Sequence, residues 1–342
     1  MTHNWLLYIA AFACSFAVSL LMTPTARKIS IKLKAIDYPK ARGLHKEPIP
    51  RMGGIAIVLG FMASMVMLTF FMPEIRTRQF AGFLIGGLMI VALGMIDDIY
   101  HLRARWKLIG QIVVALVVVM TGTRVEFIEW PIPDFLDRMD IPVTMIWVVG
   151  LINAVNFIDG VDGLAAGVSS IAGISLTALC IISGSPIAVV FATTLAGSCL
   201  GFLPRNFSPA DVIMGDTGAL FLGYVLAVTS IIGVFKGYAL LAVVIAVLVL
   251  ALPIFDTAFA ILRRMFNRKP IMKADRGHMH HRLIDHGFSH KQTVVILYIL
   301  SAIMGVVAVL IAIRDLRATI IVAVSIVVLF LMIYAYRKRV DK

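Results

Sequence analysis

Charged side chains are scarce in this sequence. Asp, Glu, Lys and Arg make up 15% of its 342 residues, and hydrophobic residues make up 60%, whereas a soluble domain carries about 25% charged residues. The chain has three cysteines, all inside apolar segments, so it shows neither a disulfide framework nor a zinc-binding cysteine motif. It also has no evident internal repeat, low-complexity linker or second domain. These absences exclude a pair of soluble domains and predict a single membrane domain over residues 1–342.

Long apolar runs recur along the whole chain. Most are close to the roughly 20 residues that a helix needs to cross a bilayer. The first run, Trp5 to Met22, has no basic residue before it and no clear small-residue cleavage site, so we interpret it as a retained span and not a signal peptide. We predict an all-α polytopic integral membrane protein with about eleven transmembrane helices, over residues 4–22, 53–72, 79–96, 107–121, 142–157, 164–183, 186–203, 217–235, 238–258, 292–313 and 318–336.

Lysine and arginine are distributed unevenly among the segments between these runs. If the N-terminus lies outside, 24 of the 31 basic residues fall on the cytoplasmic side, and the longest outer loop, 122–141, carries five acids. Because loops rich in Lys and Arg stay in the cytoplasm, we predict an outer N-terminus and a cytoplasmic C-terminus. The same distribution accounts for the net charge of +12 without a nucleic-acid partner.

Acidic residues gather at the predicted cytoplasmic ends of the spans. Asp97 and Asp98 are adjacent, Asp159 and Asp162 follow the fifth span, and Asp216 precedes the eighth. Ionisable groups near a bilayer are costly and indicate function. Five acids from separate loops on one face therefore predict a composite site. Carboxylates suit a hard cation, and Mg²⁺ takes only one or two of them, so we expect Mg²⁺, with Mn²⁺ as the alternative.

Two of these acidic motifs also have a simpler interpretation. Asp97-Asp98 could be a solvated helix end paired with Arg103 or Arg105, but adjacent carboxylates repel, and one of them can then hold a raised pKa and act as a base. Asp216 could cap the eighth helix, bind a metal, or do both.

Two polar motifs accompany the acids. In Asn153-x-x-Asn156-x-x-Asp159 the spacing of three keeps the polar groups near one face of a helix, and Gly160 and Gly163 permit close approach of a ligand to the backbone. His278-Met-His280-His281 lies in the most basic loop. It is either a solvated segment or a set of donors aimed at phosphate; zinc is disfavoured because no cysteine is near.

In this order and spacing the motifs resemble the polyprenyl-phosphate N-acetylhexosamine-1-phosphate transferase family. The segment Ala274–Arg282 departs from the Pro-x-His-His-His that is typical of the muramoyl-pentapeptide branch, and is similar to the bacterial undecaprenyl-phosphate GlcNAc-1-phosphate transferases. The resemblance runs from about Arg42 to Leu283 and includes Lys46-Glu-Pro-Ile-Pro-Arg-Met-Gly-Gly54, Asp97-Asp98, Trp106-Lys-Leu-Ile-Gly-Gln111, Asn153 to Ala165, Met214-Gly-Asp216-Thr-Gly218 and His278-Met-His280-His281.

The resemblance implies a reaction at the inner face of a bacterial cell membrane. GlcNAc-1-phosphate would pass from UDP-GlcNAc to undecaprenyl phosphate, giving UMP and undecaprenyl-diphosphate-GlcNAc, the first membrane step of teichoic-acid or surface-polysaccharide synthesis. The active site would be a cytoplasmic cleft in a bundle of transmembrane helices that is embedded in the lipid bilayer.

The resemblance also implies roles for individual residues. Asp97, Asp98 and His280 are expected to be catalytic, with Asp97 as the deprotonating carboxylate. Asp216 is expected to be the main Mg²⁺ ligand, with Asp98 beside it. Substrate binding is expected at Lys46, Lys107, Asn153, Asn156, Asp159, Asp162, Arg276, His278 and His281.

Several alternatives stay open at this point. One is the muramoyl-pentapeptide transferase of the same superfamily, and another, of a different class, is an ion-coupled transporter with an Asp and His relay. The sugar, the polyprenyl length and the oligomeric state, including a homodimer, are not set by the sequence. We favour direct attack over an aspartyl-phosphate intermediate, because the covalent route needs a carboxylate that is both in line and free of metal.

Overall fold

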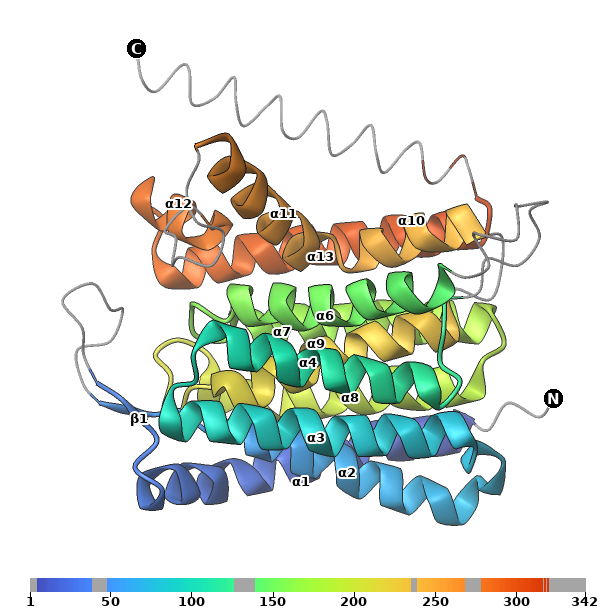
Figure 1. Ribbon diagram of the computed structural model, residues 1–342, viewed down its shortest axis with the longest axis horizontal. Helices are drawn as coiled ribbons and strands as arrows, with labels where there is room; N and C mark the ends of the chain where they lie inside the picture. Colours follow the sequence, from blue (N-terminus) through green and yellow to red (C-terminus); the bar gives the residue numbers. More distant parts are fainter. Residues whose placement is uncertain are drawn as a thin grey trace.

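The computed structural model describes residues 5–38, 48–125, 139–234, 239–267, 278–315, 317 and 319, and this part of the chain is almost entirely helical (Figure 1). Most of the long helices run along a common axis, as Figure 1 shows. The helices are α1 (Trp5–Lys32), α2 (Gly54–Phe71), α3 (Arg78–Tyr100), α4 (Ala104–Met120), α6 (Asp140–Ile158), α7 (Leu164–Ile182), α8 (Pro186–Asn206), α9 (Gly215–Gly233), α10 (Ala239–Val249), α11 (Ala251–Phe266), α12 (Met279–Asp285) and α13 (His290–Ala312), with a 3-10 turn at Pro73–Ile75.

The apolar helices confirm a polytopic membrane protein. Within the described residues, eight helices are long and apolar enough to cross a membrane: α1, α2, α3, α6, α7, α8, α9 and α13. The predicted span 107–121 is present as the 17-residue helix α4. The eleventh predicted span, 318–336, falls almost entirely outside the described residues, so the number of eleven stays a prediction, as does the side of the membrane on which each terminus lies.

The prediction of one continuous span over 238–258 is wrong. The chain breaks after Val249, and the helices on either side of the break meet at 90°. Pro253 lies four residues beyond Val249. Proline has no backbone N–H, and its ring clashes with the carbonyl of residue i−4, which favours the end of α10 at this point. The bend turns α11 away from the axis of α10 (Figure 1).

Helix α9 is the centre of the bundle, and all of its residues are buried. Its neighbours approach closely through small residues, as is common between membrane helices. A Cβ at Gly54 on α2 would lie 2.2 Å from the nitrogen of Gly218, and a Cβ at Gly94 on α3 would lie 2.6 Å from the Cα of Thr217. These crossings bring the N-terminus of α9 against α2 and the C-terminal end of α3.

Backbone hydrogen bonds tie the first loop to the start of α9. The short strands β1 (Ile36–Asp37) and β2 (Ile49–Pro50) pair antiparallel. Beyond them, Ile213 N–H donates to the carbonyl of Pro50, and Gly53 N–H donates to the carbonyl of Ile213. Arg51 is therefore fixed between two loops that are far apart in sequence.

Candidate active site

The carboxylate of Asp98 holds the N-terminus of α9. Its Oδ1 accepts from the backbone N–H of Asp216 at 2.9 Å, and its Oδ2 accepts from the backbone N–H and the hydroxyl of Thr217 at 2.9 and 2.6 Å. Arg51 Nε donates to Oδ1 at 2.9 Å. The first N–H groups of a helix have no partner within the helix, so a buried carboxylate at this point satisfies them. Asp98 is 1% exposed, and its two oxygens accept four hydrogen bonds.

Asp216, on the first turn of α9, is the centre of a second set of contacts. Lys107 Nζ and Asn156 Nδ2 donate to its Oδ1 at 3.0 and 2.6 Å, and Arg51 Nη2 donates to its Oδ2 at 2.6 Å. Burial lowers the pKa of Arg51, but its contacts with Asp98 and Asp216 outweigh this and raise it. The site thus joins α4, α6, α9 and the first loop through one carboxylate.

Asp97 completes the cluster. Its Oδ1 accepts from the backbone N–H of Leu102 at 2.7 Å, and its Oδ2 lies 2.5 Å from Lys107 Nζ. No described residue gives this buried Oδ2 a well-aligned hydrogen bond. Lys107 therefore bridges Asp97 and Asp216, and each oxygen of Asp97 has one close partner, fewer than the oxygens of Asp98 have.

The cluster fits a divalent cation. With all groups ionised, Asp97, Asp98 and Asp216 carry three negative charges against the two positive charges of Arg51 and Lys107. Asp216 and Asp97 carry carboxylate oxygens of the kind that Mg²⁺ prefers, and one or two of them are enough. Among the described residues no three His, Cys, Asp or Glu side chains form a ready-made metal cage, so water and substrate phosphate would have to complete the shell of an ion held here.

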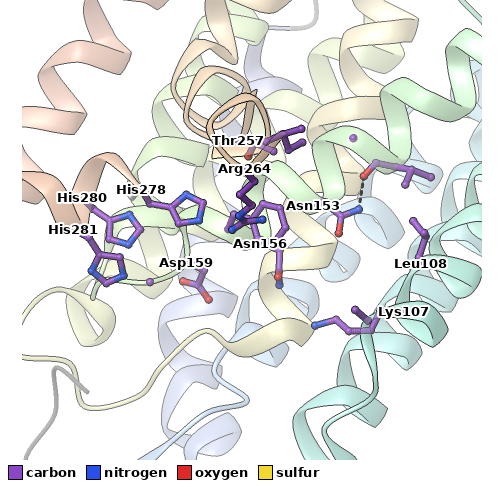
Figure 2. Close-up of a pocket in the computed structure, with 16 residues that line it drawn as sticks. Lys107, Leu108, Asn153, Asn156, Asp159, Thr257, Arg264, His278, His280 and His281 are labelled. Atoms are coloured by element: carbon purple, nitrogen blue, oxygen red, sulfur yellow. Dashed lines mark hydrogen bonds between the residues drawn. The ribbon is translucent and has the colours of Figure 1, made fainter. Parts of the chain in front are cut away.

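A cavity of about 620 Å³ opens beside this cluster, between α4, α6, α11 and α12. Figure 2 shows its arrangement: the three histidines lie on one side and Lys107 on the other, with Asn156 and Asp159 between them. The cavity therefore has an imidazole side and a side with Lys107, which is paired with Asp97 and Asp216. Apolar residues of α4 and α6 complete the wall between them.

The structure separates the residues of the Asn/Asp motif by role. Asn153 donates to Gln111 Oε1 at 2.6 Å, and so links α6 to α4 at the edge of the cavity. Asp159 lines the cavity; burial and the nearby charges of Asp216 and Asp98 raise its pKa well above the usual value. Asp162 instead accepts from the backbone N–H of Ala210 at 3.1 Å and connects the α6–α7 and α8–α9 loops.

The three histidines belong to one short helix and its N-cap. His278 and His280 stack with their ring centroids 5.8 Å apart, and the rings of His280 and His281 lie 4.3 Å apart. Burial, followed by the charge of His281, lowers the pKa of His280 to about 4, so this ring is neutral at pH 7. A Cβ at Gly160 would lie 2.7 Å from its Nε2, which explains why glycine occupies that position.

Four side chains of the site were not among the predicted site residues, and two predicted residues are not described by the structure. Lys46 and Arg276 lie outside the described residues. Gln111 and Arg51 stand within the motifs quoted above, which was the available signal. The other two residues that were not predicted are Asp256, which is hydrogen-bonded to His278, and Arg264, which lines the cavity. The sequence signal that could have identified them is two charged side chains eight residues apart, on one face of α11.

Comparisons with known proteins identify the family. The sequence profile of glycosyl transferase family 4 matches residues 80–234. The chain is 38% identical over 307 residues to a Bacillus subtilis (strain 168) protein named "Probable undecaprenyl-phosphate N-acetylglucosaminyl 1-phosphate transferase", with 88% of this chain and 84% of that protein covered. The chain belongs to glycosyl transferase family 4.

Other relatives agree with the predicted branch. A decaprenyl-phosphate N-acetylglucosaminephosphotransferase of Mycolicibacterium smegmatis is 34% identical over 310 residues, covering 81% of this chain and 75% of that protein. A phospho-N-acetylmuramoyl-pentapeptide-transferase of Pelotomaculum thermopropionicum is 29% identical over 331 residues, covering 89% and 97%. This family 4 glycosyl transferase is thus more similar to the GlcNAc-phosphate relatives, and it is a transferase of the multi-pass membrane type.

Proposed function

We propose that this enzyme transfers GlcNAc-1-phosphate from UDP-GlcNAc to undecaprenyl phosphate at the cytoplasmic face of the bacterial cell membrane. The observation that carries the proposal is the carboxylate–Lys107–Arg51 cluster beside a cavity whose opposite side carries three histidines, and whose lining includes Arg264. The names of the relatives support the polyprenyl acceptor and the GlcNAc donor. The product would begin a teichoic acid or another surface polysaccharide.

The arrangement answers the main difficulty of the reaction, which is that both substrates are anions. The acceptor phosphate must attack the β-phosphorus of the donor while the bond to the α-phosphate breaks and UMP leaves. Mg²⁺, when bound, reduces the repulsion and stabilises the charge on the leaving UMP. Lys107 and Arg51 hold positive charge at the same place, preorganised by Asp216 and Asp98.

Individual roles follow from the contacts. Asp97, whose oxygens each have a single close partner, would take a proton from the acceptor phosphate, and Asp216 would be the principal metal ligand. Asp98 is the least suited of the three to bind metal, because four donors already fill its oxygens; we propose that it acts by fixing Arg51 and the start of α9. Asn156 and Asp159 would contact the nucleotide, and the histidines the diphosphate or sugar.

Direct attack is the simpler chemistry for this geometry. A covalent aspartyl phosphate would need a carboxylate that is free of strong partners, whereas Asp98 and Asp216 are each held by several. Asp97 is the exception, since it has fewer partners than the other two acids, and we propose that it acts as the base. We therefore propose a single displacement at the β-phosphorus.

The experiment is UMP release by the purified protein in detergent with undecaprenyl phosphate and Mg²⁺. UDP-GlcNAc, UDP-GalNAc and UDP-MurNAc-pentapeptide should be compared as donors at equal concentration, with Asp216→Asn as the inactive control. We expect turnover with UDP-GlcNAc. Turnover with UDP-MurNAc-pentapeptide alone would assign the chain to the muramoyl reaction instead, and no UMP with any donor would remove the transferase proposal.

The rival transporter function finds less support in the geometry. A proton or cation relay needs ionisable groups near the middle of the membrane. Asp97 and Asp98 stand in the last turn of α3, and Asp216 stands in the first turn of α9. The cluster is therefore at an end of the bundle, where a water-soluble nucleotide can reach it.

A further inference from the structure

Asp256 on α11 is a buried acid that none of the roles above uses. It is 5% exposed and lies three residues after Pro253, on the face of α11 that also carries Ala260 and Arg264. Its carboxylate points at the next helix, because Oδ2 lies 2.8 Å from His278 Nδ1 and Oδ1 accepts from the backbone N–H of Met279 at 2.6 Å. The carboxylate therefore contacts both a side chain and a backbone N–H at the start of α12.

The backbone contact replaces a missing helix cap. His278 is the N-cap residue of α12, and its own side chain makes no capping hydrogen bond. The first N–H groups of a helix need an acceptor from elsewhere. Asp256 supplies one from α11, and so fixes where α12 begins relative to the cavity.

The side-chain contact fixes a proton. A carboxylate only accepts hydrogen bonds, so His278 must carry its proton on Nδ1 where it faces Asp256. Nε2, on the opposite side of the ring, then has a lone pair in the neutral ring and an N–H only in the imidazolium, whose charge Asp256 balances. His278 lines the cavity, and its ring stacks on His280 and lies tilted against Phe157.

We propose that Asp256 is a positioning residue, which orients His278 and keeps a proton on its Nδ1, so that the ring, once it takes a second proton from water on Nε2, donates from Nε2 to the diphosphate of the nucleotide-sugar donor. This proposal rests on the function proposed above for the nature of the ligand, although the tautomer itself does not depend on it. It makes His278, and not the deeply buried His280, the ring whose charge is matched to an anion. The proposal also assigns a role to the bend between α10 and α11, because the bend directs α11 so that Asp256 contacts the start of α12.

Asp256→Asn separates the two contacts. The amide has one oxygen and one NH₂ group where the carboxylate had two acceptors. Met279 N–H cannot become an acceptor, so the oxygen should stay with it and the NH₂ should face His278. We expect His278 to respond by moving its proton from Nδ1 to Nε2, with α12 still capped.

The first measurement needs no substrate. The ¹⁵N chemical shifts of histidine-labelled protein distinguish the two tautomers, and His278→Gln assigns the signal. We expect the Nδ1–H form in the wild type and in Asp256→Glu, which keeps two acceptor oxygens, and the Nε2–H form in Asp256→Asn. An Nε2–H form in the wild type would overturn the proposal even if Asp256→Asn failed to fold.

The second measurement is a double-mutant cycle on UMP release. We expect Asp256→Asn to lower kcat/KM by about 10- to 100-fold, the scale on which partners of metal-bound histidines act, and Asp256→Glu to restore part of it. The double variant Asp256→Asn/His278→Gln should match His278→Gln within about twofold. Independent, multiplying losses would mean that Asp256 does not act through His278, and would refute the proposal.

Asp140 provides a matched control, because it stands at the N-terminal end of α6, and the cavity lies toward the C-terminal end of that helix. Asp140 likewise accepts from a basic side chain and a backbone N–H, namely Arg124 at 3.1 Å and Ile141 at 2.6 Å. Asp140→Asn should leave UMP release unchanged. If the wild type released no UMP with any donor, the proposed function would fail while the tautomer measurement still decided the role of Asp256.

Discussion

Asp98→Asn should lower the free energy of unfolding of this protein by more than Asp97→Asn does. Asp98 accepts four hydrogen bonds at 2.6–2.9 Å and is 1% exposed. An amide oxygen accepts about two of these, and the NH₂ group then faces donors. The hydroxyl of Thr217 can rotate to accept, but Arg51 and the two backbone N–H groups cannot.

The magnitude follows from the contacts that are lost. Hydrogen bonds to a charged group contribute about 1.5–3 kcal/mol each, and removing one partner of a buried ion pair costs about 3–5 kcal/mol. We therefore expect the free energy of unfolding to fall by about 3–5 kcal/mol. At about 2–4 °C per kcal/mol, the melting temperature should fall by about 6 °C or more, and activity should fall with it.

The assay is thermal unfolding of purified variants in one detergent, followed by tryptophan fluorescence, beside UMP release well below the melting temperature. Asp97→Asn is the matched control, because Asp97 has only two close contacts and Lys107 keeps Asp216 as a partner when the charge of Asp97 is removed. It should lose turnover while its melting temperature falls clearly less than that of Asp98→Asn. If Asp98→Asn melted like the wild type and lost only turnover, Asp98 would act on the reacting groups and not on the start of α9.

Three further predictions concern the metal, the pH dependence and the topology. Asp216→Asn should lose turnover at every Mg²⁺ concentration while the protein still inserts and binds detergent as a folded species; recovery of near-normal rates would remove Asp216 from the metal site. His280 has a pKa of about 4 in the fold and about 6.5 when unfolded, so protonation favours the unfolded chain. The free energy of unfolding should fall by about 2 kcal/mol from pH 7 to pH 5 on its account, and His280→Gln should show a correspondingly smaller fall in equilibrium denaturation. In a Cys14→Ser background, Asp211→Cys should react with impermeant thiol reagents only in inside-out vesicles, and Ser183→Cys only from outside; the reverse pattern would place the site on the wrong side for UDP-sugars.

The sequence by itself determined the membrane class and most of the helices. Nine of the eleven predicted spans correspond to single described helices. The reason is that the length of an apolar run is a local property of the sequence, and the thickness of the bilayer sets the length that a spanning helix needs. It also marked the acids and histidines of the site, since polar groups in so apolar a chain stand out. It did not predict the break after Val249 or the extension of the first helix to Lys32, because proline is tolerated in some membrane helices and breaks others.

Tertiary structure decided which of the marked residues share a task. Asp97 and Asp98 are neighbours in sequence, but successive side chains on a helix point about 100° apart, so one meets Lys107 and the other Arg51 and Thr217. The link between Asp256 and His278 joins residues 22 positions apart, one on α11 and the other at the start of α12, and no local pattern specifies such a contact. Composition and spacing predict that a side chain is polar and where it lies along the chain; its partner depends on how α9, α11 and α12 pack.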